Sequence, residues 1–105
     1  MKVRWTQRSI QDLRDIGNFI AKDKPGAARR WVARLQERAR KAALVPLAGR
    51  RVPELDREDV REVLLGNYRI VYRLYPKYIE VLTVFEGHRL FPIEVAPSDP
   101  ASQDR

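Results

Sequence analysis

Five side chains in the second half of the sequence are of the types that could together perform acid–base chemistry on a phosphodiester. Arg69 and Arg73 stand four residues apart in the apolar stretch YRIVYRL, and Glu54, Glu62 and His88 flank them. Cleavage of RNA without a metal needs a general base, a general acid and a cation that stabilises the pentavalent phosphate. In such a site the arginines would clamp the phosphate, and Glu54, Glu62 or His88 would move the protons.

The same residues also allow a purely structural interpretation. Glu62, opposite Arg69 or Arg73 on a neighbouring strand, would form a cross-strand ion pair worth roughly 0.2–1 kcal/mol. The arginines would then be neutralised within the sheet and would not await a phosphate. A histidine at the end of a strand, as His88 is, is more often a surface residue than a catalyst. Whether the protein is an enzyme depends on which interpretation holds.

The first half of the chain predicts one strand and two helices. The segment 2–6, KVRWT, alternates charged and apolar residues, as a short strand does. From residue 10 to residue 20, isoleucines and a leucine recur at steps of three and four, which predicts an amphipathic helix with Thr6 or Ser9 as its N-cap. Pro25 suits the first turn of a second helix, whose apolar face runs to Ala43. The two helices should form an antiparallel hairpin.

The second half predicts a loop and three strands. Residues 45–59 contain two prolines, a glycine and alternating charges, so we expect a surface loop. Segments 60–66, 68–75 and 78–87 are rich in β-branched and aromatic residues and are separated by turn residues, which predicts an antiparallel meander. Alternation in the middle segment places Arg69 and Arg73 on the face opposite Ile70 and Tyr72. If the helices cover the latter face, the arginines line the opposite, concave side of the sheet.

Positive charge is concentrated in the front of the chain. Residues 1–51 carry 14 Lys and Arg against 4 Asp and Glu, whereas residues 52–105 carry 7 against 10, and the whole chain has a net charge of +7. Arginine predominates, and its planar guanidinium binds carboxylates or phosphates through two bonds. We therefore predict an acidic partner, either a protein segment or a nucleic acid, unless the charge only solvates a helix face. The candidate partner-binding residues are Arg30, Trp31, Arg34, Arg38, Arg50, Arg51, Arg61, Arg69, Arg73 and Arg89.

Composition narrows the class of protein further. A chain of 105 residues fits one domain, which we place at residues 1–95, with residues 96–105 as a polar tail that we expect to be disordered. The chain has no cysteine and one histidine, so we predict no metal site, and we expect no cofactor. Neither a signal peptide nor a long apolar run is present, which predicts a cytoplasmic protein that does not bind membranes.

The order and spacing of four segments resemble the ParE/RelE superfamily of bacterial toxins, and the ParE branch most closely. These segments are LRDIGNFIAKDKPGAARRWV, PLAGRRVPEL, VREVLLGNYRIVYRL and IEVLTVFEGHR, and together they cover nearly the whole chain except the tail. The resemblance implies an α+β fold in which an N-terminal strand and an antiparallel helix hairpin pack on a twisted antiparallel sheet. The periodicity of the sequence leads to the same β-α-α-β-β-β arrangement.

The resemblance implies two different activities, and a shared fold does not choose between them. ParE-like toxins inhibit DNA gyrase without a known catalytic reaction of their own, whereas RelE-like toxins cleave messenger RNA on the ribosome. RelE-like sites use lysines or Glu, arginines, and a Tyr or His. Here Arg69, Arg73, His88 and Glu54 match such a site only in part, because no lysine lies between Lys41 and Lys77 and a phenylalanine follows the last strand.

We therefore predict a toxin without a catalytic site that inhibits DNA gyrase, with the ribonuclease as the alternative. A scaffold that only binds an antitoxin is a third possibility. The resemblance also implies an antitoxin of the ParD type, whose acidic, amphipathic tail wraps the toxin. An arginine-rich surface complements such a tail.

Overall fold

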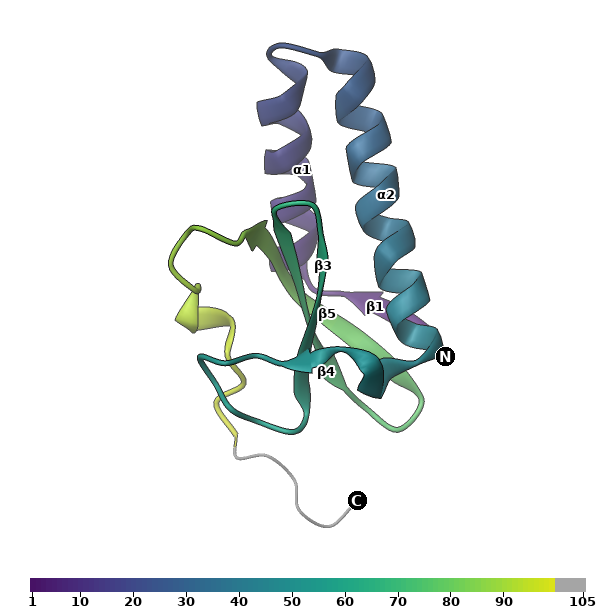
Figure 1. Cartoon of the computed structure of the whole chain (residues 1–105), viewed down its shortest axis with the longest axis vertical. Coiled ribbons are helices and arrows are strands. Elements are labelled where there is room, and N and C mark those ends of the chain that lie inside the picture. Colours follow the sequence, from purple (N-terminus) through teal and green to yellow (C-terminus); the bar gives the residue numbers. More distant parts are fainter. Residues whose placement is uncertain (100–105) are drawn as a thin grey trace.

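The computed structural model describes residues 1–99, which form a helix hairpin packed on a five-stranded sheet (Figure 1). The predicted order of elements is confirmed, and the loop between the helices and the meander contains a short helical turn and a short strand that the sequence did not predict. The elements are β1 (Lys2–Trp5), α1 (Gln7–Ala21), α2 (Pro25–Leu44), η1 (Pro46–Ala48), β2 (Arg50–Arg51), β3 (Val60–Leu65), β4 (Tyr68–Leu74), β5 (Tyr78–Glu86) and η2 (Ile93–Val95).

The strands lie in the order β1-β5-β4-β3-β2, so the first strand of the chain pairs with the last. Strands β2 to β5 are antiparallel to their neighbours, but β1 runs parallel to β5, with Val3 opposite Ile79. The predicted antiparallel meander of β3, β4 and β5 is confirmed, and the parallel pairing of β1 makes the whole sheet mixed. No tight turn joins β1 to β5, so nothing local fixes their relative direction.

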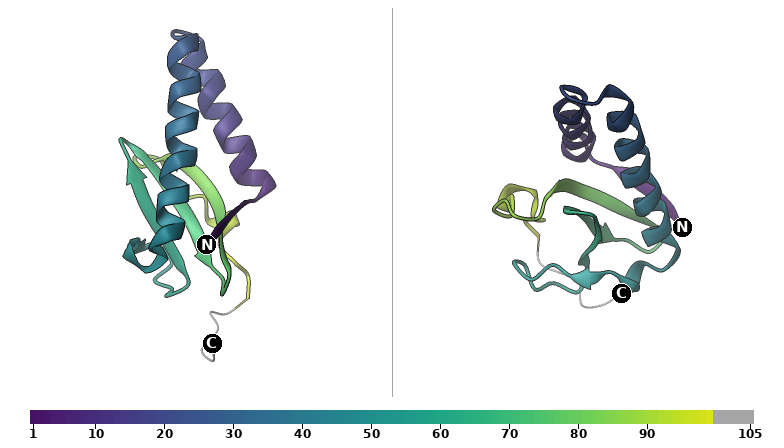
Figure 2. Two further views of the ribbon diagram at one scale, coloured as in Figure 1. Left: turned by 90° about the vertical axis from the view of Figure 1, so that its right-hand side faces the viewer. Right: turned by 45° about the horizontal axis from the view of Figure 1, so that its top comes forward.

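The first residues of each helix explain where it begins. The side chain of Thr6 accepts a hydrogen bond from the backbone N–H of Ser9 at 3.0 Å, which makes Thr6, and not Ser9, the N-cap of α1. Pro25 occupies the first turn of α2, as predicted. The two helices meet at the turn between them and diverge toward the sheet (Figure 2). None of the helices within residues 1–99 is long and apolar enough to span a lipid bilayer.

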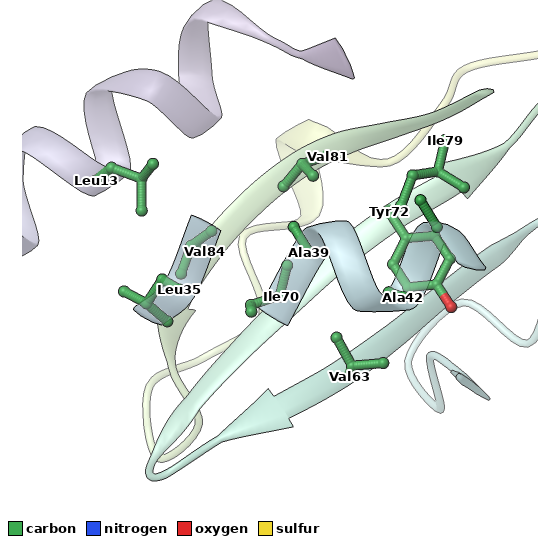
Figure 3. Close-up of a cluster of buried hydrophobic side chains, with 11 residues drawn as sticks. Leu13, Leu35, Ala39, Ala42, Val63, Ile70, Tyr72, Ile79, Val81 and Val84 are labelled. Carbon is green, nitrogen blue, oxygen red and sulfur yellow. The ribbon is translucent and has the colours of Figure 1, made fainter. Parts of the chain in front are cut away.

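The main core lies between the helices and the sheet (Figure 3). It joins apolar residues of both helices to one face of β3, β4 and β5. Leu35 and Tyr72 are fully buried there, and the Tyr72 hydroxyl donates a 2.6 Å hydrogen bond to the carbonyl oxygen of Pro46. The buried members are Leu13, Leu35, Ala39, Ala42, Ala43, Val63, Ile70, Tyr72, Ile79, Val81 and Val84.

A bulge in β5 links the sheet to α1. Val71 lies opposite Thr83 and Tyr72 lies opposite Val81, so Leu82 is an extra residue on β5. Bulges leave backbone groups outside the regular ladder. The carboxylate of Asp12, in α1, accepts hydrogen bonds from the backbone N–H of Val84 at 3.0 Å and from the Thr83 hydroxyl. Asp12 thus anchors α1 on the bulge.

The opposite face of the sheet carries a second, smaller core. Val52, Val60, Val71, Leu82 and Phe85 are buried in it, and residues from the loop before β3 and from the segment after β5 cover them. The face on which the arginines were predicted to lie is therefore partly covered by other segments of the chain. Alternation did place Arg69 and Arg73 on this face, but apolar residues share it with them.

The first part of the predicted tail lies against this second face. Arg57 donates hydrogen bonds to the carbonyl oxygens of Pro97 and Asp99, and Arg73 pairs with the Asp99 carboxylate. Residues 96–99 are thus held on the sheet by two arginines. The remainder of the predicted tail, residues 100–105, lies outside the described residues.

Candidate functional site

Arg69 is buried at the centre of a four-residue ionic cluster. Its Nε donates to Glu62 Oε1 at 2.7 Å, and its Nη1 and Nη2 donate to the two carboxylate oxygens of Glu54 at 2.9 and 2.8 Å. Its guanidinium also lies 5.0 Å from the ring centre of Phe85. The hydrogen bonds from Arg69 hold the pKa of the Glu54 carboxyl below its usual range, and the bond to Glu54 raises the pKa of Arg69.

The carboxylate of Glu62 links Arg69 to the second guanidinium of the cluster, that of Arg50. Its side chain is 0% exposed and its second oxygen accepts a 2.6 Å hydrogen bond from Arg50 Nε. The alternative interpretation of Glu62 as an ion-pair partner of Arg69 is thus the one that the structure shows. Glu62 lies opposite Val71, however, so it reaches Arg69 diagonally across the two strands. All four charges of the cluster are compensated within it, since two carboxylates meet two guanidinium groups.

Arg73 belongs to a second cluster, at the other end of β4. The buried carboxylate of Asp59 accepts hydrogen bonds from Arg73 Nε at 3.0 Å and from Arg57 Nε and Nη2 at 2.9 and 3.0 Å. The outer nitrogens of Arg73 hold both oxygens of Asp99, at 3.1 and 2.8 Å. Burial raises the pKa of Asp59, but the hydrogen bonds and charges of Arg57 and Arg73 outweigh it, so the net pKa lies below the usual value.

His88 is remote from Arg73. The side chain of His88 is 70% exposed, and its Nδ1 lies 3.9 Å from Glu86 Oε2. The residue opposite Arg73 on β5 is Glu80, and six residues of extended strand, roughly 20 Å, separate Glu80 from Glu86. Among the four residues of the alternative ribonuclease site, the structure joins only Arg69 and Glu54 by hydrogen bonds. Arg73 belongs to the other cluster, and His88 is exposed and far from Arg73.

Several of the predicted partner-binding residues lie along one side of α2. Arg30 is exposed, and Arg34 lies 4.7 Å above the ring of Trp31. Trp31 is half-buried because its ring packs edge-on against Tyr68, with 5.7 Å between ring centres. One turn further, Arg38 donates to the carbonyl oxygen of Leu64. Trp31 therefore packs α2 against the turn between β3 and β4, and part of its side chain remains accessible to a partner.

The remaining predicted partner-binding arginines have partners within the chain. Arg51 pairs with Glu58 at 3.0 Å, and Arg61 pairs with the same carboxylate at 2.8 Å while donating to the Gly49 carbonyl oxygen. Arg89 lies 3.5 Å from Glu86 and is exposed. Among residues 1–99, no three His, Asp or Glu side chains lie close enough to hold a metal ion.

The structure contains a groove that the sequence did not predict. It has a volume of about 1050 Å³ and opens where α1 and α2 diverge (Figure 2), next to Trp5 of β1. Its walls are mainly apolar, and Arg14 and Arg29 contribute positive charge. The sequence signal that could have indicated it is the run of small residues on the facing sides of the helices. The lining residues are Trp5, Ile10, Leu13, Arg14, Gly17, Asn18, Ala21, Pro25, Ala28, Arg29, Val32, Ala33 and Gln36.

Comparison with solved structures identifies the same fold in two toxin–antitoxin complexes. A chain of the chromosomal ParDE toxin–antitoxin system from Pseudomonas aeruginosa superposes with a TM-score of 0.70 and 22% identity, over 82% of this chain and 95% of that chain. A chain of the RelBE2 toxin–antitoxin complex from Mycobacterium tuberculosis gives a TM-score of 0.58 and 25% identity, over 81% and 95%. The ParE/RelE fold inferred from the sequence is confirmed.

Comparison of sequences identifies the branch. A protein of Sinorhizobium fredii named "Putative toxin Y4kP" is 37% identical over 95 residues, which is 87% of this chain and 93% of that protein. Residues 3–91 match the family described as the ParE toxin of the type II toxin–antitoxin system parDE. This match spans both helices and all five strands, and the chain belongs to the ParE toxin family of type II toxin–antitoxin systems.

Proposed function

We propose that this ParE-family toxin acts by inhibiting DNA gyrase and that a ParD-like antitoxin neutralises it. The observation that carries the proposal is that Arg69 and Arg73 are each paired with carboxylates of this chain. Each guanidinium is held by two carboxylates of the same chain, at 2.7–3.1 Å. A phosphate would have to displace these carboxylates before either arginine could stabilise a transition state. A toxin that works by binding a protein requires no such exchange.

The groove between α1 and α2 is the surface that we assign to the antitoxin. An amphipathic helix or extended segment could bury its apolar side against Leu13 and Val32 while its acidic side meets Arg14 and Arg29. The net charge of +7 favours encounter with an acidic partner. Burial of apolar anchors in the groove would then set the lifetime of the complex.

Induction of the toxin without its antitoxin tests the proposed target. For a gyrase inhibitor, DNA breaks and the SOS response should appear before protein synthesis declines, and the purified chain should inhibit supercoiling by gyrase. An Arg73→Lys variant that folds should arrest growth as the wild type does, since the arginine does no chemistry. Prompt cleavage of messages on purified ribosomes, with gyrase unaffected, would contradict the proposal.

The RelE-like ribonuclease is the second candidate because the chain also shares its fold with the RelBE2 complex. Under that function, Arg69 or Arg73 would contribute to catalysis, and Arg73→Lys should abolish message cleavage while antitoxin binding survives. The Arg73→Lys variant thus separates the two activities.

A matched pair of charge reversals on α2 tests the antitoxin surface. Arg29 lines the groove, whereas Arg40 is exposed on the same helix and pairs with Glu37 outside it. We expect Arg29→Glu to slow association with a ParD-like antitoxin from the same genome and Arg40→Glu to have little effect. Stopped-flow association rates at low and high salt measure the difference. Equal effects of the two reversals would place the antitoxin elsewhere.

A further inference from the structure

The arginine cluster at the end of β4 holds a peptide segment of this chain through its side chain and its backbone. Arg73 Nη1 and Nη2 donate to the two Asp99 carboxylate oxygens at 3.1 and 2.8 Å. Arg57 Nη1 donates to the carbonyl oxygens of Pro97 at 3.1 Å and of Asp99 at 2.8 Å. The cluster thus contacts an aspartate side chain and two backbone carbonyls of one short segment.

Neighbouring side chains fix the orientation of the two arginines. Asp59 is buried, and it fixes both guanidinium groups with three hydrogen bonds. The ring of Tyr75 lies 5.3 Å from the Arg73 guanidinium, and Tyr75 itself stacks on Tyr78. Only the outer edge of the Arg73 guanidinium, which carries two parallel N–H groups, therefore faces a ligand. This fork fits a carboxylate.

The charge balance requires an anion at this position. Arg57 and Arg73 carry two positive charges and Asp59 carries one negative charge, so the cluster keeps one uncompensated charge when Asp99 is absent. With residues 97–99 in place, the side chains of Arg57 and Arg73 are only 16% and 14% exposed, so this segment shields their charges from water. The side chain of Asp99, by contrast, is 58% exposed, and among residues 1–99 only Arg73 donates hydrogen bonds to it.

We propose that Arg57 and Arg73, oriented by Asp59, form a binding site for an aspartate-containing peptide, and that the chain's own segment Pro97–Asp99 occupies this site until an acidic peptide of another protein replaces it. The contacts to backbone carbonyls favour a peptide over a free phosphate, which would offer no carbonyl to Arg57. The site is separate from the α1–α2 groove that we assign to the antitoxin, because none of Arg57, Asp59 and Arg73 lines that groove.

The test uses the full-length, ¹⁵N-labelled chain and follows the side-chain Nε–Hε signals of Arg57 and Arg73 by NMR at slightly acidic pH. Asp99→Asn removes the carboxylate that fills the site. Glu94→Gln is the matched control, because Glu94 is an equally exposed carboxylate of the same segment that pairs with Arg8 instead. We expect the Arg73 signal to move in Asp99→Asn and to stay in place in Glu94→Gln, with the backbone spectrum of both variants unchanged elsewhere.

The probe is an acetylated and amidated Ala-Pro-Ser-Asp-Pro peptide, with Ala-Pro-Ser-Asn-Pro and inorganic phosphate as comparisons. Because a short tether gives an effective concentration on the order of millimolar, the wild type should need at least about tenfold more peptide than Asp99→Asn for the same shift. The asparagine peptide should not bind. Equal responses of wild type and Asp99→Asn would overturn self-occupancy, absence of saturable binding would overturn the site, and binding of phosphate as tight as that of the peptide would overturn peptide recognition.

Discussion

Substitution of Glu62 by glutamine tests whether the arginines of the sheet serve its stability. Glu62 is completely buried and accepts hydrogen bonds from Arg69 at 2.7 Å and from Arg50 at 2.6 Å. Glutamine preserves the volume of the side chain but leaves one positive charge uncompensated. Removal of one partner from a buried ion pair typically costs about 3–5 kcal/mol.

Two features of the cluster reduce that cost. Arg69 keeps its two bonds to Glu54, and the side chain of Arg50 is 58% exposed, so water solvates its charge. We therefore expect Glu62→Gln to lower the free energy of unfolding by about 2–3 kcal/mol. Glu54→Gln is the control, because Glu54 is 39% exposed and Arg69 retains Glu62 when Glu54 is changed. Its cost should stay below about 1 kcal/mol.

Urea unfolding followed by circular dichroism at pH 7 measures both variants, provided that the transition is two-state. The slope of the free energy against urea concentration should not change, since neither substitution alters the surface that unfolding exposes. If Glu62→Gln and Glu54→Gln cost the same, or if Glu62→Gln is neutral, the buried cluster does not stabilise the sheet. Arg69 would then not be held in the sheet for its stability.

Three further outcomes follow from the packing and the pKa directions. Gly66 has a φ of 57°, and a Cβ there would lie 3.1 Å from the Trp31 ring. Gly66→Ala should therefore lower the free energy of unfolding in urea by more than about 1 kcal/mol. Gly26→Ala should not, because the nearest neighbour of a Cβ at Gly26 is the flexible end of Arg30. Leu35→Ala should cost about 2–5 kcal/mol by the same measurement, because Leu35 is fully buried, and a smaller loss would mean that the helices collapse onto the cavity. The folded pKa of Asp59 is depressed, so its stabilising effect is complete above the unfolded value of about 3.9 and is lost as the pH falls through the folded value. The difference in unfolding free energy between wild type and Asp59→Asn should therefore stay constant from pH 7 to about pH 5 and shrink below about pH 4, and a difference that shrinks between pH 7 and pH 5 would contradict the assignment.

Local patterns in the sequence were sufficient to predict both long helices, the strands β1, β3, β4 and β5, and the faces of the central strand β4. The apolar steps of three and four in α1 and α2 and the alternation around Ile70 and Tyr72 are each set by neighbours in the chain. The parallel pairing of β1 with β5 was not predictable in this way, because the two strands are more than 70 residues apart. The extra residue Leu82 was also missed, since a bulge depends on the partner strand and on Asp12 of α1.

The candidate site was predicted less completely than the fold. The pairing of Glu62 with Arg69 was among the predicted alternatives. The partners of Arg73 were not predicted, because Asp59 and Asp99 come from a loop and a terminal segment that have no periodicity. Arg57, which holds the terminal segment, also went unnoticed among the alternating charges of that loop. The groove between the helices depends on the angle at which α1 and α2 cross, and no single stretch of sequence encodes that angle.

The pairing of β1 with β5 has a consequence for the time at which the protein folds during its synthesis. Strand β5 lies between β1 and β4 and supplies Ile79, Val81 and Val84 to the main core. A ribosome must therefore translate the chain through Glu86 before the sheet can be completed, because β5 is the strand that joins β1 to β4. Fragments that end before Glu86 would lack part of that strand, so a folded toxin would form only after the chain has been translated through this residue.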